Sequence, residues 1–172
     1  MKKAYIILLF TLFIYTNISA NSGVEITVDI EIPKFNVSEY HAPYLATWIE
    51  TEDRKTIIAT SLWFDEQEKW LKDIRQWWRK TGRNQTKPYD GVTGATRRPG
   101  MHKLKLSDME ISNSLVPGQY IFLIEAAREV GGREVLKIPF SWPIDNNFTF
   151  SVRGEKELGK ITLTINTLQD SL

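Results

Sequence analysis

The sequence contains no cysteine, which excludes disulfide bonds, thiolate metal sites, cysteine nucleophiles, cysteine-ligated iron–sulfur clusters and a lipobox. It has two histidines, His41 and His102, so a histidine-rich metal site is not expected. Met101 and His102 together could supply a metal or haem ligand, but one histidine beside a strand is more typical of a structural role. No Gly-x-Ser-x-Gly motif, phosphate-binding loop or dinucleotide fingerprint is present, so nothing favours a hydrolase or a kinase.

The chain also lacks an excess of charge of either sign. Lysine and arginine number 22 and aspartate and glutamate 21, a net charge of +1, so general nucleic-acid binding is not predicted. Hydrophobic residues make up 42% and charged residues 25%, which excludes global disorder. A chain of 172 residues without an internal repeat or a linker is expected to form one domain.

Only one hydrophobic run is long enough to consider as a membrane element, residues 4–15 (AYIILLFTLFIY). Two lysines precede it, and a short polar stretch ending in Ala20 follows it. This layout predicts a secretory signal peptide over residues 1–20, cleaved after Ala20, and an exported protein. A transmembrane anchor is the alternative. The run is short for a transmembrane span, which needs about 20 apolar residues. Ile18, at the third position before the expected cut, is an imperfect residue for a cleavage site. An uncleaved signal that stays as a membrane anchor therefore remains an alternative.

Alternating apolar and polar residues predict a mostly β protein. Residues 24–32 (VEITVDIEI) place their apolar side chains on one face and their polar ones on the other, as in a strand with one solvated side. Residues 44–51 and 55–64 predict a hairpin, and Gly131-Gly132 predicts another hairpin turn. Further strands are expected at residues 101–106, 119–127, 136–142, 148–152 and 161–165. This spacing is typical of a single antiparallel β-sandwich domain over residues 21–172.

One amphipathic helix is predicted at residues 66–80. Asp65 is placed to cap it, Glu68 completes a capping box, and Gly82 follows as a terminator. Its apolar residues share one face: Trp70, Leu71, Ile74, Trp77 and Trp78. We expect this stripe to pack on a sheet, and the alternative is that one of the rings also forms the wall of a cofactor or ligand site.

Residues 81–100 (TGRNQTKPYDGVTGATRRPG) show no periodicity, which predicts a long Gly/Thr-rich loop of the kind that carries function. Within it, DGVTGAT resembles the acceptor motif of covalently flavinylated bacterial redox proteins: Asp, two free positions, Ser/Thr, Gly, Ala, Ser/Thr. In those proteins a periplasmic flavin transferase moves FMN from FAD onto the final hydroxyl as a phosphodiester. The resemblance implies that Thr96 is the covalent FMN acceptor. The other motif positions are Asp90, Thr93, Gly94 and Ala95.

The local chemistry is consistent with that role. Gly94 and Ala95 remove side-chain bulk, so another enzyme can approach the backbone. Arg97 and Arg98 lie outside the motif but directly follow the hydroxyl, and we infer that they pair with an anionic diester. Tyr89 or a helix tryptophan is available to stack on a flavin ring. The simpler interpretation is a turn before the strand at residues 101–106.

A second resemblance covers most of the chain. It rests on five segments: 47–50 (TWIE), 69–73 (KWLKD), 75–79 (RQWWR), 92–100 (VTGATRRPG) and 125–129 (EAARE). They resemble the predicted periplasmic proteins of domain of unknown function 2271. That resemblance implies a periplasmic bacterial protein associated with flavin transfer and with membrane redox proteins of PepSY type. The strand after Pro117-Gly118 is similar to those of immunoglobulin-like modules, which implies an immunoglobulin-like sandwich.

Two functional hypotheses follow. The first is an exported, non-enzymatic electron-transfer protein carrying FMN on Thr96. The second is an unmodified periplasmic binding or accessory module, linked to metal or haem uptake, whose aromatic helix and long loop form a partner surface. Glu125 lies in an apolar run (YIFLIEAA), and we expect it to be partly buried and paired with Arg128 or Arg133 as a structural group.

Overall fold

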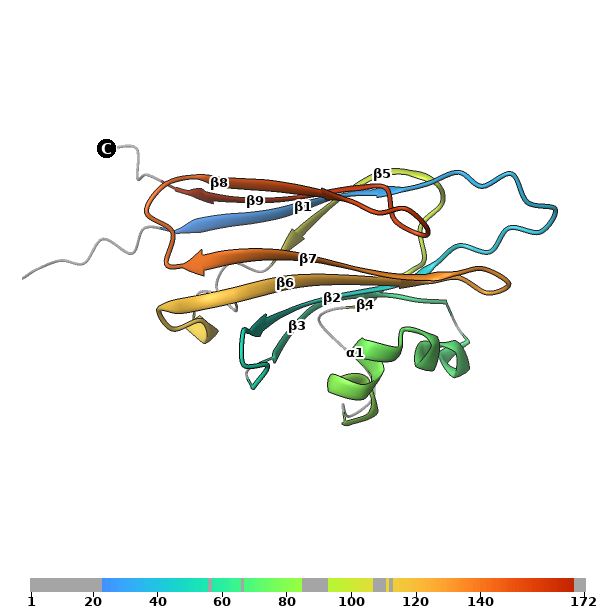
Figure 1. The fold of residues 1–172 in the computed structure, drawn as a ribbon, viewed down its shortest axis with the longest axis horizontal. Helices are drawn as coiled ribbons and strands as arrows, with labels where there is room; N and C mark the ends of the chain where they lie inside the picture. The colour runs from blue at the N-terminus through green and yellow to red at the C-terminus, as the bar shows by residue number, and fades with distance from the viewer. Residues whose placement is uncertain are drawn as a thin grey trace, which may run out of the picture.

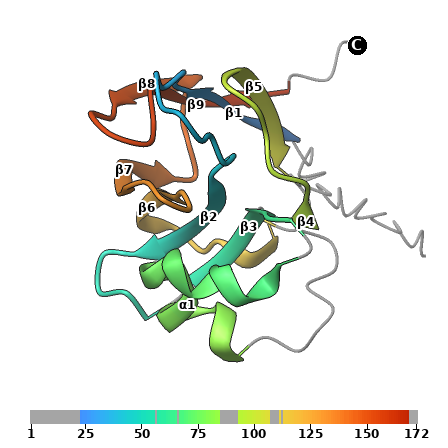
Figure 2. The ribbon, with the colours of Figure 1, turned by 90° about the vertical axis from the view of Figure 1, so that its right-hand side faces the viewer.

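The protein, a computed structural model, consists of two β-sheets that face each other, with short helices on the outer side of one sheet (Figures 1 and 2). The structure describes residues 23–55, 57–65, 67–84, 93–106, 111 and 113–168. The predicted signal peptide, Tyr89 and Asp90 lie outside these residues. Within them, the prediction of a mostly β protein is confirmed.

The first sheet has four strands, and all its neighbours are antiparallel. Its order across the sheet is β5 (Gly100–Leu106), β1 (Val24–Ile32), β9 (Lys160–Thr167) and β8 (Phe148–Arg153). The predicted alternation of β1 is present in the structure, with every second residue buried. The register sets Ile26 beside Ile165 and Val28 beside Leu163, so the apolar side chains of both strands share the inner face.

The second sheet has five strands. Its order is β4 (Thr93–Gly94), β3 (Ile57–Trp63), β2 (Tyr44–Thr51), β6 (Gly118–Ala127) and β7 (Arg133–Trp142). The β2–β3 and β6–β7 pairs are the two predicted hairpins. β4 differs from the expected antiparallel pattern, because it pairs in parallel with β3. The main core fills the space between the two sheets, where Ile30 and Leu163 lie in one cluster with Ile49, Phe122 and Ile138.

A second apolar layer lies on the outer face of the five-stranded sheet. β2 and most of β6 are buried on both faces, so neither shows the alternation of a strand with one wet side. The outward residues Trp48 and Leu123 cluster with Leu71, Ile74 and Trp77 of the helical segment. The prediction that the helical stripe packs on a sheet is therefore confirmed, and Figure 2 shows the helices against β2 and β3.

The single helix predicted at residues 66–80 is wrong. The chain forms a 3₁₀ helix η1 (Glu68–Asp73) and a separate α-helix α1 (Arg75–Lys80), with non-helical Ile74 (φ −77°, ψ 75°) between them. Asp65 accepts a hydrogen bond from the Gln67 amide at 2.7 Å but does not cap either helix. The amides at the start of α1 donate instead to the distant Glu125 carboxylate, which a local capping rule does not detect.

The loop predicted at residues 81–100 is also more ordered than expected where it is described. A second 3₁₀ helix, η2 (Gly82–Asn84), follows α1, and Thr93–Gly94 forms β4. α1 ends at Lys80, where the sequence predicted the end of the helix, but Gly82 starts η2 rather than stopping helical structure. It allows a close approach, because a Cβ atom there would lie 2.5 Å from Cζ3 of Trp77. Strand β5 then begins at Gly100 rather than at Met101.

The two sheets are tied together near the β6–β7 turn. Arg128 Nε donates to Glu157 at 2.9 Å, and the side chains are only 6% and 4% exposed. The Gly132 amide also donates to Glu157, at 2.6 Å. The Glu134 carboxylate accepts amide hydrogen bonds from the turn between β8 and β9, at Glu155, Lys156 and Leu158. These bonds join the hairpin of one sheet to the turn of the other.

Candidate functional site at the Thr96 segment

Thr96 lies in the short segment between β4 and β5, outside any β ladder, and is half-buried. β4 sets the position of this segment, because the Phe64 amide donates to the Gly94 carbonyl at 2.9 Å. Gly94 is half-buried beside the Trp63 ring, whereas Thr93 and Ala95 are exposed. The last four residues of the acceptor-like motif therefore lie at the edge of the five-stranded sheet.

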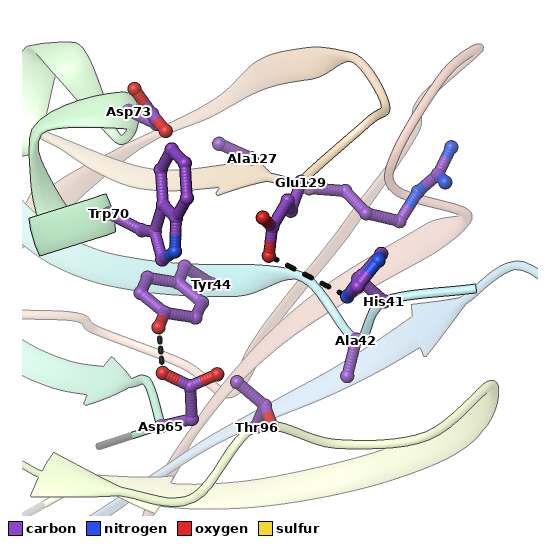
Figure 3. A pocket seen from close by; sticks show the side chains of 10 residues that line it. His41, Ala42, Tyr44, Asp65, Trp70, Asp73, Thr96, Ala127 and Glu129 are labelled. Atoms are coloured by element: carbon purple, nitrogen blue, oxygen red, sulfur yellow. Dashed lines mark hydrogen bonds and ion pairs between the residues drawn. The ribbon is translucent and has the colours of Figure 1, made fainter. Parts of the chain in front are cut away.

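The Thr96 side chain lines a pocket of about 60 Å³ (Figure 3). We call this hollow the Thr96 pocket. Its walls come from the start of β2, the segment before η1, η1 itself and the β6–β7 turn. Its lining residues are His41, Ala42, Tyr44, Asp65, Trp70, Asp73, Thr96, Ala127, Arg128 and Glu129. The threonine hydroxyl thus shares a pocket with two aromatic rings, those of Tyr44 and Trp70.

Tyr44 is fixed within this pocket by its hydroxyl group. The hydroxyl donates to the Asp65 carboxylate and lies 3.0 Å from the Gln67 carbonyl oxygen. Its ring meets the Phe64 ring edge-to-face at 6.5 Å between centroids. Asp65 thereby joins the end of β3 to the start of η1 and holds the Tyr44 ring between Thr96 and Trp70, as Figure 3 shows.

The second aromatic ring of the pocket, Trp70, is half-buried, whereas Tyr44 is buried. Its Nε1 donates to the Gln67 side-chain oxygen at 3.2 Å, and Lys69 Nζ lies 4.9 Å from the ring centroid. Trp70 also borders a neighbouring hollow of about 560 Å³ beneath the β6–β7 turn, which we call the hairpin groove. The two hollows share Trp70, Asp73, Ala127, Arg128 and Glu129.

The charges around the Thr96 pocket are mixed. Asp65, Asp73 and Glu129 bring carboxylates, and His41 Nδ1 lies 3.6 Å from Glu129. Arg128 contributes little free positive charge to the pocket, because Glu157 neutralises its guanidinium. Among the described residues, no group of three or more histidine, aspartate and glutamate side chains is arranged to hold a metal ion.

Arg97 and Arg98 are both exposed on the same segment as Thr96. The Arg97 guanidinium lies 5.5 Å from the Trp63 ring centroid. His102 Nε2 donates to the Arg98 carbonyl at 2.7 Å, and the His102 ring meets Trp63 edge-to-face. His102 thus contacts both the Thr96 segment and Trp63, and its expected structural role stays a prediction.

The structure brings together residues that the sequence does not link. Thr96 and Trp70 were singled out from the motif and the helical stripe, but Tyr44, Asp73 and Glu129 were missed as site residues, and Asp65 was considered only as a cap. No local signal identifies them, because they come from three separate elements that meet only in the tertiary structure. The prediction that Glu125 pairs with an arginine is confirmed: Arg133 Nε donates to it at 2.6 Å.

Two facing sheets, a helical layer on one of them and a pocket beside an edge segment define a mostly β protein with a candidate site at Thr96. The chain belongs to the family described as "Predicted periplasmic protein (DUF2271)", whose model matches residues 25–160. The family resemblance seen in the sequence is thus confirmed. Neither a curated protein nor a solved structure matches the chain. None of the helices in the described ranges is long and apolar enough to span a membrane.

Proposed function

We propose that this protein is an exported electron-transfer protein that carries FMN covalently on Thr96. The observation that supports this most directly is the position of the hydroxyl. Thr96 is half-buried but outside the β ladder, and its side chain lines a pocket with the aromatic rings of Tyr44 and Trp70. A threonine sealed in the core or committed to a strand would not be open to another enzyme.

The attachment would proceed by phosphoryl transfer from FAD. The Thr96 oxygen attacks the phosphorus of the FMN half, the bond from that phosphorus to the bridging oxygen breaks, and AMP leaves with that oxygen. The hydroxyl proton passes to a base of the flavin transferase or to solvent. The product is a phosphodiester with one negative charge, which the exposed Arg97 and Arg98 are positioned along the chain to neutralise.

The flavin would supply the redox chemistry, accepting and returning electrons, while this chain supplies position and surroundings. The protein would then be a carrier without substrate turnover of its own. Its partners would be a periplasmic flavin transferase and a membrane redox protein of PepSY type, as the family resemblance implies. Two further assignments belong to the proposal: cleavage after Ala20 and an immunoglobulin-like arrangement of the sandwich, supported by two facing sheets with inward-pointing apolar residues.

The test is the intact mass of the chain after coexpression with a periplasmic flavin transferase. We expect a gain equal to FMN less one water, because the ester forms with loss of AMP from FAD. Thr96→Ser keeps a hydroxyl and should be modified, whereas Thr96→Ala should not. Thr149→Ala, at an exposed threonine of β8 outside the motif, should be modified like the wild type.

An unmodified mass, obtained while the same transferase modifies a known acceptor protein, would overturn the proposal. The chain would then be better explained as an unmodified periplasmic binding or accessory module. Modification that persists in Thr96→Ala would instead move the attachment to another residue.

A further inference from the structure

We propose that Trp70 is the stacking platform for the flavin and that the hairpin groove receives the isoalloxazine ring. This inference rests on the proposed attachment at Thr96 and adds where the ring lies. It assigns a ligand role to a groove that runs from η1 and the start of α1 to the β6–β7 turn.

The first argument is the size of the two hollows. The Thr96 pocket, at about 60 Å³, has room for a few water molecules but not for a three-ring heterocycle. The hairpin groove, at about 560 Å³, is in the range of small-molecule sites, roughly 300–1,000 Å³. A flavin tethered by its phosphate at Thr96 would therefore leave the first hollow and enter the second.

The second argument is the position of Trp70 at the junction. Its side chain lines both hollows, so a group that passes from one to the other must run along the indole. The indole is held at its edge by the bond from Nε1 to Gln67, and the side chain is only partly buried. Lys69 lies over the ring and adds a positive charge near one face.

The other aromatic rings near Thr96 are less suited to stacking. Tyr44 is only 7% exposed, and its hydroxyl is committed to Asp65. Trp63 is only 4% exposed and already lies under the Arg97 guanidinium. Trp78 is half-buried on α1 but lines neither hollow. Of these described rings, Trp70 is therefore the one that is partly exposed and lines both hollows.

The groove also offers polar groups that suit the ring. The pyrimidine side of isoalloxazine carries carbonyl and ring-nitrogen acceptors. Arg75 is exposed where it lines the groove, and Arg133 lines it while pairing with Glu125. Guanidinium donors of this kind match such acceptors and favour the anionic reduced ring.

The experiment compares flavin emission per bound FMN in the flavinylated wild type, Trp70→Leu, Trp70→Tyr and Trp78→Leu. Stacking on an indole quenches flavin emission. An aromatic stacking contact shifts the equilibrium between stacked and unstacked ring by roughly two- to tenfold. We therefore expect Trp70→Leu to raise the emission by a similar factor. Trp70→Tyr keeps an aromatic face and should remain mostly quenched. Trp78→Leu is the matched control, since it removes a half-buried tryptophan of the same helical layer and should leave emission unchanged.

Intact mass and circular dichroism accompany each emission measurement and separate the outcomes. If FMN is attached and all variants are folded, equal emission in wild type and Trp70→Leu overturns the stacking role alone. Equal rises in Trp70→Leu and Trp78→Leu also overturn it, because general loosening of the helical layer would then be the cause. A wild type without FMN overturns this inference together with the proposed function. If Trp70→Leu does not fold, Trp70→Tyr decides, because free-FMN emission there is incompatible with stacking at this position.

Discussion

Asp53 shows how much a single exposed carboxylate can be perturbed by its own turn. A hydrogen bond from the Thr51 hydroxyl at 2.6 Å, together with hydrogen bonds from the Lys55 side chain and amide, lowers the pKa of Asp53 from 3.8 to about 2. The reciprocal contact raises the pKa of Lys55. Because the pKa of Asp53 is lower in the folded protein, its stabilising effect is complete above about pH 4 and is lost as the pH falls through about 2.

We predict that Thr51→Val raises the pKa of Asp53 towards 3.8, since the Thr51 hydroxyl is the largest cause of the shift. An NMR titration of the side-chain carboxyl carbons measures it. Lys55→Met removes the side-chain hydrogen bond and the charge of Lys55 but keeps its backbone amide, so the pKa of Asp53 should rise in this variant too. An unchanged pKa of Asp53 in Thr51→Val would contradict the assignment of the Thr51 hydroxyl as the largest cause.

At the scale of elements, α1 depends on a partner from another part of the chain. The Gln76 and Trp77 amides donate to the two oxygens of Glu125, at 3.0 and 2.8 Å, and Arg133 pairs with the same carboxylate. Glu125 is fully buried on β6, and these three donors of the described residues balance its charge. It holds α1 on the sheet, next to η1 and Trp70.

We predict that Glu125→Ala lowers the free energy of unfolding by about 2–4 kcal/mol, because it leaves buried amides and one side of Arg133 without their acceptor. Urea denaturation followed by circular dichroism measures the change. Glu155→Gln, at an exposed glutamate, should change stability by less than about 0.5 kcal/mol. Equal effects of the two substitutions would show that Glu125 is not a helix anchor.

The strands could be predicted from the sequence because their pattern is local. The alternation of β1 fixes both its conformation and its buried face, and the glycines between β6 and β7 mark a turn. The break at Ile74 could not be predicted, since the apolar stripe from Trp70 to Trp78 fits one continuous helix. The first amides of the new helix donate to the distant Glu125 carboxylate, a contact that the local sequence does not reveal. Tertiary contacts therefore decide where the helices of this layer begin and end.

The candidate site also has one part that the sequence could predict and another part that it could not. A seven-residue motif was enough to single out Thr96, because the motif is contiguous in the chain. Tyr44, Asp65 and Glu129 belong to three different segments, and each has an ordinary role in its own element. Their proximity to Thr96 follows from strand order and from the β6–β7 turn, which no local pattern specifies.

For the whole molecule, Arg128 and Glu157 form the contact that joins the two sheets at the β6–β7 turn. Arg128 also lies against the Phe35 ring, 4.4 Å from its centroid, and near Tyr40, whose pKa is raised by burial. The buried Nη1 of Arg128 and the Tyr40 hydroxyl lack hydrogen-bond partners among the described residues. This ion pair is thus poorly solvated, and breaking it should cost more than removing it.

We predict that Glu157→Gln lowers the free energy of unfolding by about 3–5 kcal/mol, because it leaves the Arg128 charge buried without its counter-ion. The double substitution Arg128→Met with Glu157→Met should recover a large part of this loss, since it removes both charges. Chemical denaturation of both variants at neutral pH provides the comparison. If the double variant is as unstable as the single one, the unpaired charge is not the cause of the lost stability, and the prediction is contradicted.

The short strand β4 bears on whether FMN could be attached after the chain has folded. β4 has two residues at the margin of its sheet and is joined to only one neighbour. Because few backbone hydrogen bonds hold β4, we expect it to separate from β3 at a lower free-energy cost than the longer strands would need. If Thr96 is the FMN acceptor, as proposed, the folded chain could then present it to a flavin transferase as an extended peptide. FMN attachment would not have to occur before folding.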